Sequence, residues 1–355
     1  MDRRRPFGVL RIDKPLLEYP FADAPKVGES LEVAPGVVWI RMPLPMRLDH
    51  INIWALEDGD GWTIVDCGMR YPATVDVWAR LLAGRLGAKP VTRVLVTHMH
   101  PDHIGMAGWL TRRFTCRLWI TRLEYVTVRM LAADSGREAP DDAIQFYRAA
   151  GWDEPQIENY RARFGSFGSA IYTLPDSYRR ISDRDEIVIG EHLWRVVVGN
   201  GHSPEHACLY CEQSGVFISG DQVLPRITSN ISVFPTEPEA DPLGDWLESL
   251  RKLRREVPNG VLVLPSHNDC FRGLHERLAH LEAHHLESLA RLRDALSRPL
   301  RAVDASDALF QRKMTDAFQN SLATGESLAH LNHLMRRGEA VVTAASNGVN
   351  WYRRA

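Results

Sequence analysis

The sequence predicts an α/β fold in which short strands and helices alternate around buried sheets. Short apolar runs recur through residues 31–118 and again through residues 186–264, which is typical of buried strands. Segments with apolar residues at helical spacing separate several of these runs, and Gly or Pro often stands at their ends. Repeated returns to a buried sheet in this order are typical of α/β proteins.

Residues 31–118 contain the first group of strands. Thr74–Leu86 has apolar residues at helical spacing, and Gly87 stands where that helix should stop. Ile104–Phe114 is a second expected helix. The expected strands are Val37–Arg41, Asn52–Leu56, Trp62–Asp66, Val91–Thr97 and Cys116–Ile120.

Residues 122–182 differ in composition from the segments on either side, because they are rich in Arg, Tyr, Phe and acidic residues. Asp141–Ala150 and Pro155–Phe164 have helical patterns. We therefore expect a mostly helical insertion rather than an independent domain. Strands are expected to resume at Glu186–Ile189, Leu193–Val198, Ala207–Tyr210, Val216–Ser219 and Val261–Leu264.

The C-terminal part begins with a long amphipathic helix over Leu274–Leu296, which Pro299 closes. Helical patterns follow at Asp304–Ala317 and Ser327–Arg337, and Asn347-Gly348 joins two short runs. Helix, helix and hairpin predict a small winged-helix-like module. The expected domains are a main domain over residues 1–297 and a C-terminal module over residues 298–355.

The composition is ordinary for a globular protein, since 45% of the 355 residues are hydrophobic and 25% are charged. The net charge of -2 and the pI near 6.7 give no overall attraction to nucleic acid or an anionic membrane. We find no signal-peptide core and no apolar run that could span a membrane, so we expect a soluble, cytoplasmic protein. The five cysteines are scattered, and we interpret Cys208 and Cys211 as packing residues.

The strongest functional signal is the string H-x-H-x-D-H over His98–His103, directly after an expected strand. Three imidazoles and one carboxylate within six residues do not fit an apolar core, because each polar group needs a partner. At the end of a strand, such alternating side chains can converge on a common point. Neutral imidazole nitrogens and carboxylate oxygens are ligands for zinc, iron or manganese, so the string predicts a metal site.

The same arrangement recurs at the ends of other expected strands. His202 follows Leu193–Val198, and Asp221 follows Val216–Ser219. His267 follows another apolar run, and Asp66 closes an earlier one. Because sites of α/β folds gather at one edge of a sheet, these side chains are expected to form one centre.

These motifs resemble the five ordered motifs of the metallo-β-lactamase superfamily across roughly residues 31–296. The resemblance implies a four-layer αββα sandwich with a dinuclear metal site at the edge of its two sheets. The glyoxalase-II-like and general metallo-hydrolase branches keep all the ligands, as this chain does. The matching segments are Asp66-Cys67-Gly68, the H-x-H-x-D-H string, Gly201-His202-Ser203-Pro204, Ser219-Gly220-Asp221 and Ser266-His267.

The resemblance also divides the ligands between two divalent ions. Asp221 is expected to bridge both ions. Asp66 would support the site from behind its ligands, and His206 is a candidate for the same role. Zinc is the expected ion, with iron or manganese as alternatives. The first ion is expected on His98, His100 and His202, and the second on Asp102, His103 and His267.

The reaction implied is hydrolysis of a thioester, ester or lactone bond in a small molecule. Two metals lower the pKa of a bridging water toward about 7, and one polarises the substrate carbonyl. Asp102 and Asp221 are the expected catalytic carboxylates. Hydrolysis of β-lactams is disfavoured, because true β-lactamases usually lack a bridging aspartate at the position of Asp221.

Candidate substrate contacts lie in the insertion and in Leu224–Pro235, which are expected to wall the entrance. Arg226 follows Asp221 closely and is a candidate contact for an anionic or CoA-linked substrate. The other candidates are Tyr125, Tyr147, Tyr172 and Tyr178.

Two alternative functions stay open. Persulfide dioxygenases share the H-x-H-x-D-H pattern but use one iron, held by two histidines and one aspartate. His267 favours a second metal, and the metal count would discriminate. The C-terminal module permits nucleic-acid binding or a nuclease, but Glu326 and Glu339 dilute its basic charge. We therefore expect this module to pack as a cap or in a homodimer, without a nucleic-acid partner.

Overall fold

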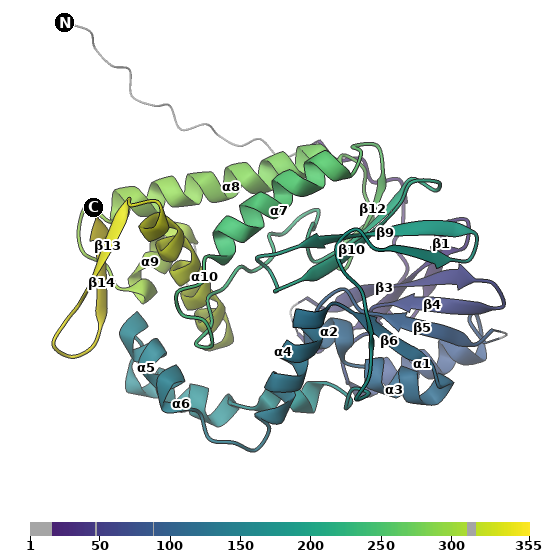
Figure 1. The fold of residues 1–355 in the computed structure, drawn as a ribbon, viewed down its shortest axis with the longest axis horizontal. Coiled ribbons are helices and arrows are strands. Elements are labelled where there is room, and N and C mark those ends of the chain that lie inside the picture. The colour runs from purple at the N-terminus through teal and green to yellow at the C-terminus, as the bar shows by residue number, and fades with distance from the viewer. Residues whose placement is uncertain (1–15, 47, 88, 311–316) are drawn as a thin grey trace, which may run out of the picture.

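Two β-sheets lie next to each other in the right-hand half of the molecule as Figure 1 shows it. The computed structural model describes residues 16–46, 48–87, 89–310 and 317–355. Within these residues, the first sheet has seven strands in sequence order and the second has five. The first sheet contains β1 (Ser30–Ala34), β2 (Val37–Pro43), β3 (His50–Asp58), β4 (Gly61–Val65), β5 (Val91–Leu95), β6 (Arg117–Ile120) and β7 (Arg179–Arg180). The second contains β8 (Glu186–Ile189), β9 (His192–Gly199), β10 (His206–Cys211), β11 (Val216–Gly220) and β12 (Leu262–Pro265).

Helices cover the outer face of each sheet, which gives the predicted four-layer αββα sandwich. One buried core lies between the first sheet and its helices, and a second lies between the two sheets. A third core lies between the second sheet and the helices on its far side. The first sheet is covered by α1 (Pro72–Ala83), α2 (Pro101–Ile104) and α3 (Ala107–Phe114), and the second by α7 (Pro242–Glu256) and α8 (Leu274–Ala295).

Strand β2 shows how the sequence builds two cores at once. Its side chains Val37 and Trp39 lie in the core between the sheets. The alternate residues Val38, Ile40 and Met42 lie in the core under the helices. Because successive strand residues point to opposite faces, a continuous apolar run is what a strand buried on both faces requires.

The insertion over residues 122–182 is mostly helical, as predicted. Ile144, Trp152 and Ile157 form part of a small core of its own. The indole Nε1 of Trp152 also donates to Thr324 Oγ1 at 3.0 Å, which ties the insertion to the C-terminal part. The elements of the insertion are α4 (Arg122–Ala133), α5 (Asp141–Ala150), α6 (Glu154–Arg163) and a 3₁₀ turn (Ser166–Ala170), before β7 joins the first sheet.

One expected helix, Ile104–Phe114, is wrong as a single element. The structure breaks it between α2 and α3, at Gly105 and Met106. The Met106 N–H donates to the Gly68 carbonyl at 3.0 Å, and the Gly105 carbonyl accepts from Tyr172 N at 2.7 Å. Because these backbone groups bond to neighbouring segments, they cannot continue the helical ladder.

Helix α7 is absent from the sequence prediction, although its signals are ordinary. Asp241 caps its start and accepts from Gly244 N at 3.0 Å, and Pro242 occupies the first helical position. Trp246 and Leu250 lie on its buried face against the second sheet. A cap followed by this spacing is a recognisable helix start.

The C-terminal part has the predicted order of helix, helix and hairpin, and its winged-helix likeness remains a prediction. The first helix ends at Leu309, short of the expected end at Ala317, and residues 311–316 of that prediction lie outside the described residues. The second helix starts at Ala317, earlier than the expected Ser327. Residues 323–332 in the middle of that helix are buried on all sides, so no amphipathic stripe marks this stretch. The elements are α9 (Ala302–Leu309), α10 (Ala317–Arg336), β13 (Ala340–Ala344) and β14 (Asn350–Arg354).

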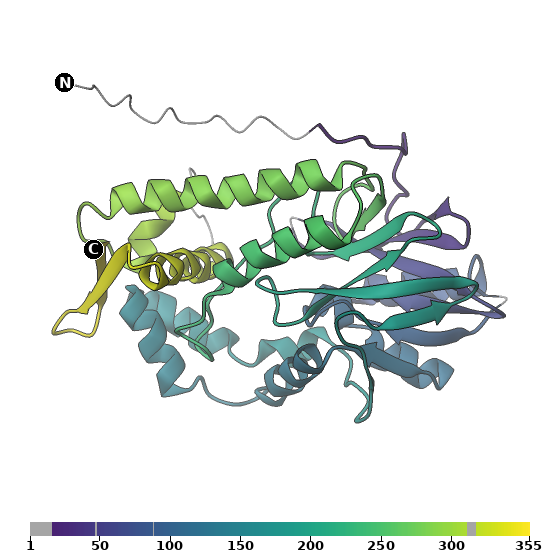
Figure 2. The ribbon, with the colours of Figure 1, turned by 45° about the horizontal axis from the view of Figure 1, so that its top comes forward.

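The C-terminal elements gather at one end of α7 and α8, which Figure 2 shows from a second angle. Leu331, Leu334 and Tyr352 share one continuous core with Trp246 and Leu278 of the main domain. Burying each such side chain stabilises the fold by about 1.5–3 kcal/mol. The C-terminal part therefore packs into the main domain's own core.

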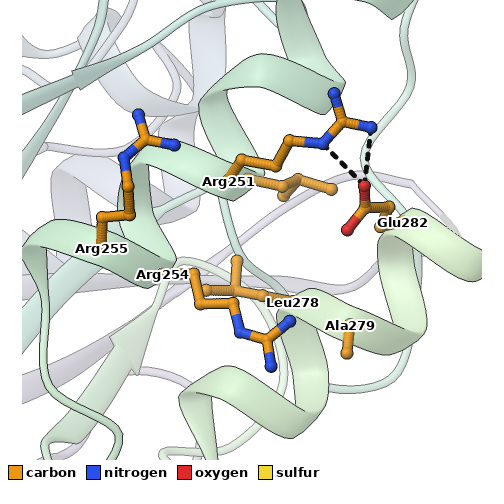
Figure 3. Close-up of a pocket in the computed structure, with 7 residues that line it drawn as sticks. Arg251, Arg254, Arg255, Leu278, Ala279 and Glu282 are labelled. Carbon is orange, nitrogen blue, oxygen red and sulfur yellow. Dashed lines mark hydrogen bonds and ion pairs between the residues drawn. The ribbon is translucent and has the colours of Figure 1, made fainter.

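Several features lie away from the predicted site. Cys208 and Cys211 face opposite cores of β10, which confirms that they are packing residues. None of the helices in the described ranges is long and apolar enough to cross a membrane. A cavity of about 250 Å³ between α7 and α8 contains the ion pair of Arg251 and Glu282, and no predicted metal ligand lines it (Figure 3).

Candidate metal centre

The seven predicted ligand side chains converge where strands of both sheets end. They follow β5, β9, β11 and β12, so loops of both sheets contribute. Their ligand atoms form two groups, and within each group all atoms lie within 4.8 Å of one another. One group is His98, His100, His202 and Asp221, and the other is Asp102, His103 and His267.

The carboxylate of Asp221 lies between the two groups. Its Oδ2 is 3.5 Å from His202 Nε2, in the first group. Its Oδ1 is 3.5 Å from both His103 Nε2 and His267 Nε2, in the second. These distances exceed ordinary hydrogen bonds. Two ligands that share one tetrahedral zinc, with bonds near 2.05 Å, stand roughly 3.3 Å apart. The spacing therefore suits ligands of common cations.

Three histidines are held in the tautomer that metal binding needs. His202 Nδ1 donates to the Asn230 carbonyl at 2.8 Å, and His267 Nδ1 donates to the His50 carbonyl at 3.0 Å. His103 Nδ1 lies 2.8 Å from Asp66 Oδ2. Because a carbonyl can only accept, Nδ1 must carry the hydrogen in the first two rings. Their Nε2 lone pairs consequently point at the centre.

Buried polar atoms without a hydrogen-bond partner indicate whether cations fit between the candidate ligands. His103 Nε2 and Asp221 Oδ1 are buried and have no hydrogen-bond partner among the described residues. His202 Nε2 and His98 Nε2 also face each other at 3.3 Å. Buried polar atoms without a partner are costly, and lone pairs turned toward one another repel. Divalent cations would satisfy all of these atoms, so the residues fit a metal site.

The pKa values of most ligands favour the forms that bind metal. Burial lowers the pKa of His98 well below its ordinary value, and it lowers that of His100 to about 3. Burial alone would raise the pKa of Asp221, but His267 and His103 outweigh it and hold this pKa well below its usual range. At neutral pH these imidazoles are therefore neutral and this carboxylate is ionised.

His103 behaves differently from the other ligands of the string. Burial would lower its pKa, but the carboxylates of Asp102, Asp221 and Asp66 outweigh burial and raise this pKa well above the ordinary value. In the absence of a cation these carboxylates therefore favour a second proton on the ring. Metal binding must release it, which makes metal affinity dependent on pH.

Asp66, the predicted supporting residue, contacts the centre from behind the ligands. Its carboxylate accepts from Thr97 N and from Thr97 Oγ1, both at 2.8 Å, and it holds His103 Nδ1. The residue is 1% exposed and has a φ of 59°, a left-handed conformation that is uncommon outside glycine. A strained, buried carboxylate with this role is typical of a functional site.

We expect Asp66→Asn to weaken metal binding by roughly 10–100-fold, because it removes the charged acceptor that orients His103. Chelator competition with a chromophoric ligand would measure the affinity. Asp60→Asn, in the exposed turn between β3 and β4, is the matched control and should leave affinity unchanged. Equal affinity of the Asp66 variant and the wild type would contradict this role.

His206 also contacts ligands from outside, as predicted. Its Nε2 accepts from the Asp221 backbone N–H at 3.0 Å, and its ring stacks on His98 with centroids 4.7 Å apart. Gly220 makes this approach possible: its φ is +53°, and an added Cβ would lie 2.4 Å from His206 Cε1. His206 therefore fixes the backbone that carries the Asp221 carboxylate.

Glu124, which sequence reasoning missed, joins two ligand loops. It is 0% exposed, on α4. One oxygen accepts from Met99 N at 2.8 Å, and the other accepts from Ser203 Oγ and Glu205 N, each at 2.7 Å. The loop of His98 and His100 is thereby bonded to the loop of His202. The available signal was an acidic residue on the buried face of α4, beside Tyr125 and Val128.

Glu326 of α10 lies behind His202. Its Oε2 accepts from Asn230 Nδ2 at 2.9 Å, and the Asn230 carbonyl in turn accepts from His202 Nδ1. Burial raises the pKa of Glu326 to about 8. The C-terminal helix therefore supports a ligand through a carboxyl group that keeps its proton at neutral pH.

The free energy of unfolding should fall as the pH rises from 5 to 8, in part because of Glu326. The folded state keeps this proton up to about 8, whereas the unfolded state releases it near 4.5. In that window the folded state binds more protons, so stability declines by up to about 1 kcal/mol per pH unit. Glu326→Gln should flatten the pH dependence of urea unfolding, whereas the exposed Glu248→Gln should not. An unchanged slope in the first variant would refute the assignment.

The five candidate substrate contacts do not gather at one site, and their roles remain predictions. Tyr125 stacks on Tyr178 with centroids 4.0 Å apart, and its hydroxyl donates to Pro175 O. Tyr172 is partly buried beneath Arg70. Arg226 is exposed and pairs with Asp269 at 2.7 Å, and Tyr147 lines a cavity that also contains Met99.

Known proteins match this chain over its whole described architecture. The family model of the metallo-beta-lactamase superfamily matches residues 46–267, and that of the metallo-beta-lactamase-like C-terminal domain matches residues 289–355. The crystal structure of a beta-lactamase domain protein from Burkholderia ambifaria is 44% identical in sequence. Its TM-score is 0.88, and the match covers 96% of this chain and 98% of that chain.

Curated relatives agree with the structural match. The probable metallo-hydrolase YqjP of Bacillus subtilis is 25% identical over 332 residues, which cover 89% of this chain and 97% of that protein. The acyl-coenzyme A thioesterase MBLAC2 of Gallus gallus is 24% identical over 71% of this chain and 83% of its own length. The first family model alone spans more than half of the chain and includes all seven candidate ligands. The chain therefore belongs to the metallo-beta-lactamase superfamily, as a metal-binding hydrolase.

Proposed function

We propose that this chain hydrolyses an acyl thioester with the help of two divalent ions, with carboxylic esters and lactones as secondary substrates. The observation that carries the proposal is the position of Asp221, whose two carboxylate oxygens face separate groups of ligands. One carboxylate shared in this way suits two ions. Zinc is the ion we propose, because histidine nitrogens and carboxylate oxygens are common zinc ligands.

The bound ions would supply a water of lowered pKa and would polarise the substrate carbonyl. The chain's own residues orient that chemistry. Asp102, whose side chain is 20% exposed, is the carboxylate of the centre most open to solvent among the ligands, and its Oδ2 lies 3.4 Å from His267 Nε2. It is placed to accept a proton from the attacking water. Cys67 is not the nucleophile, because its buried Sγ donates to the His103 carbonyl.

Thioesters are favoured by the names of two relatives. MBLAC2 is an acyl-coenzyme A thioesterase. The atrochrysone carboxyl ACP thioesterase of Aspergillus fumigatus is 22% identical over 65% of this chain, although the match covers 40% of that protein. A thiolate is also a good leaving group, since ordinary thiols have a pKa near 8.5 and need little help from an acid.

Elemental analysis of the purified protein and of His267→Ala tests the metal count. We expect close to two zinc ions per chain, falling toward one in the variant. Hydrolysis of a thioester, an ester and a lactone with the same acyl group would then be compared, with the thioester fastest. One iron per chain, unchanged by the substitution, would contradict the proposal and favour a persulfide dioxygenase-like enzyme.

A further inference from the structure

A second site adjoins the metal centre: a cavity of about 540 Å³ enclosed largely by the insertion. Small-molecule sites typically have volumes of roughly 300–1,000 Å³ and mostly apolar walls. Helix α4 presents Thr127, Met130 and Leu131 to this cavity, and Tyr160 of α6 and Phe164, directly after α6, line its other side. Because these residues recur at three- and four-residue spacing, each helix turns one continuous face to the space.

The cavity begins at the metal-ligand loop. Met99, which stands between His98 and His100 in the chain, lines it. The opposite wall includes Phe234, from the segment that precedes α7. None of the seven candidate ligands lines the cavity, so a molecule bound at the centre would reach it past Met99.

Large apolar side chains on the walls of the cavity are exposed to solvent, which folding alone does not explain. Met130 and Phe234 line the cavity, yet 43% and 45% of their surfaces are exposed. Large apolar side chains left exposed around one hollow mark sites that an apolar ligand covers. Three charged residues also line the cavity: Asp142 is exposed, Asp134 is paired with Arg137, and Arg163 is partly buried.

We propose that this cavity binds the acyl chain of the substrate, so that the natural substrates are thioesters of medium- or long-chain acyl groups. The inference rests on the proposed thioester hydrolysis. It adds where the acyl chain of the substrate binds and why the length of that acyl chain matters. The scissile carbonyl lies at the metal centre, and the alkyl chain runs past Met99 between α4, α6 and Phe234.

Activity against a series of thioesters with one common thiol tests the proposal. The acyl groups would contain two to twelve carbons. Burying each added methylene should raise kcat/KM roughly two- to fourfold until the cavity is full. The variant Thr127→Phe places a ring in the cavity and should remove this rise for long chains while leaving acetyl thioester hydrolysis nearly unchanged. The control Val126→Phe adds the same ring at the neighbouring position of α4, which is exposed and does not line the cavity.

Calorimetry of the metal-free protein separates this inference from the proposed function. Dodecanoate should bind the wild type and Val126→Phe at least tenfold more tightly than butyrate does, and Thr127→Phe should lose that preference. A rate that is independent of acyl length, in an enzyme that does hydrolyse acetyl thioester, would overturn the cavity assignment alone. Absence of hydrolysis for every thioester, with the dodecanoate preference intact, would overturn the proposed function and leave the apolar site standing.

Discussion

Replacing Asp221 with alanine will lower kcat/KM by at least roughly 10³-fold, because one change removes an oxygen from each of the two ligand groups. Stabilisation of the transition state by metal ions is worth several kcal/mol, and about 4 kcal/mol corresponds to this factor. The loss will also leave His103 Nε2 and His267 Nε2 without the carboxylate that lies 3.5 Å from each. Steady-state kinetics and metal analysis on the same sample measure both effects.

The matched control for this variant is Asp176→Ala. Its carboxylate is 95% exposed and pairs with Arg129 on the surface, so its removal should change neither kinetics nor metal content. If Asp221→Ala keeps two ions and activity within tenfold of the wild type, Asp221 does not bridge the metals.

Replacing Glu124 with alanine will destabilise the protein by roughly 3–5 kcal/mol, since it leaves three buried donors without an acceptor. Both ligand loops lose their common anchor, so metal affinity should fall as well. Urea unfolding followed by circular dichroism, with and without zinc, measures both.

Two further variants sharpen the prediction for Glu124. The amide in Glu124→Gln can still accept from Ser203 Oγ and Glu205 N, but its NH₂ group would oppose the Met99 N–H. We therefore expect an intermediate loss of stability. Glu138→Ala removes an exposed acid between α4 and α5 and should have almost no effect. If Glu124→Ala is as stable as the control, the three donors that Glu124 accepts from must find other partners.

The metal ligands were predictable because their chemistry is local in the sequence. His98, His100, Asp102 and His103 fall within one short string, and the remaining ligands each follow an apolar strand. Alternating apolar patterns likewise located most strands, because burial on both faces leaves a continuous apolar run. The break between α2 and α3 could not be predicted, since the partners that bond Gly105 and Met106 lie in distant segments.

The supporting residues were harder to predict for a related reason. Glu124 bonds to backbone groups near positions 99 and 205, and backbone donors leave no mark on the sequence. Glu326 and Asn230 meet only because α10 folds against the segment before α7. The middle of α10, residues 323–332, is buried on every side, so its sequence lacks the amphipathic stripe that would have revealed the helix.

Helix α10 supports the candidate ligand His202 indirectly, through Asn230. This support bears on the order in which the protein is synthesised and folds. Glu326 holds Asn230, and the Gly325 carbonyl accepts from Val233 N at 3.1 Å, so the segment behind this ligand is secured by residues translated long after it. Chains are synthesised from the N-terminus at roughly 5–20 residues per second, and their parts fold in that order. All the candidate ligands therefore leave the ribosome before the helix that fixes one of them. Tight metal uptake is then expected only after α10 has been synthesised and has folded against this segment.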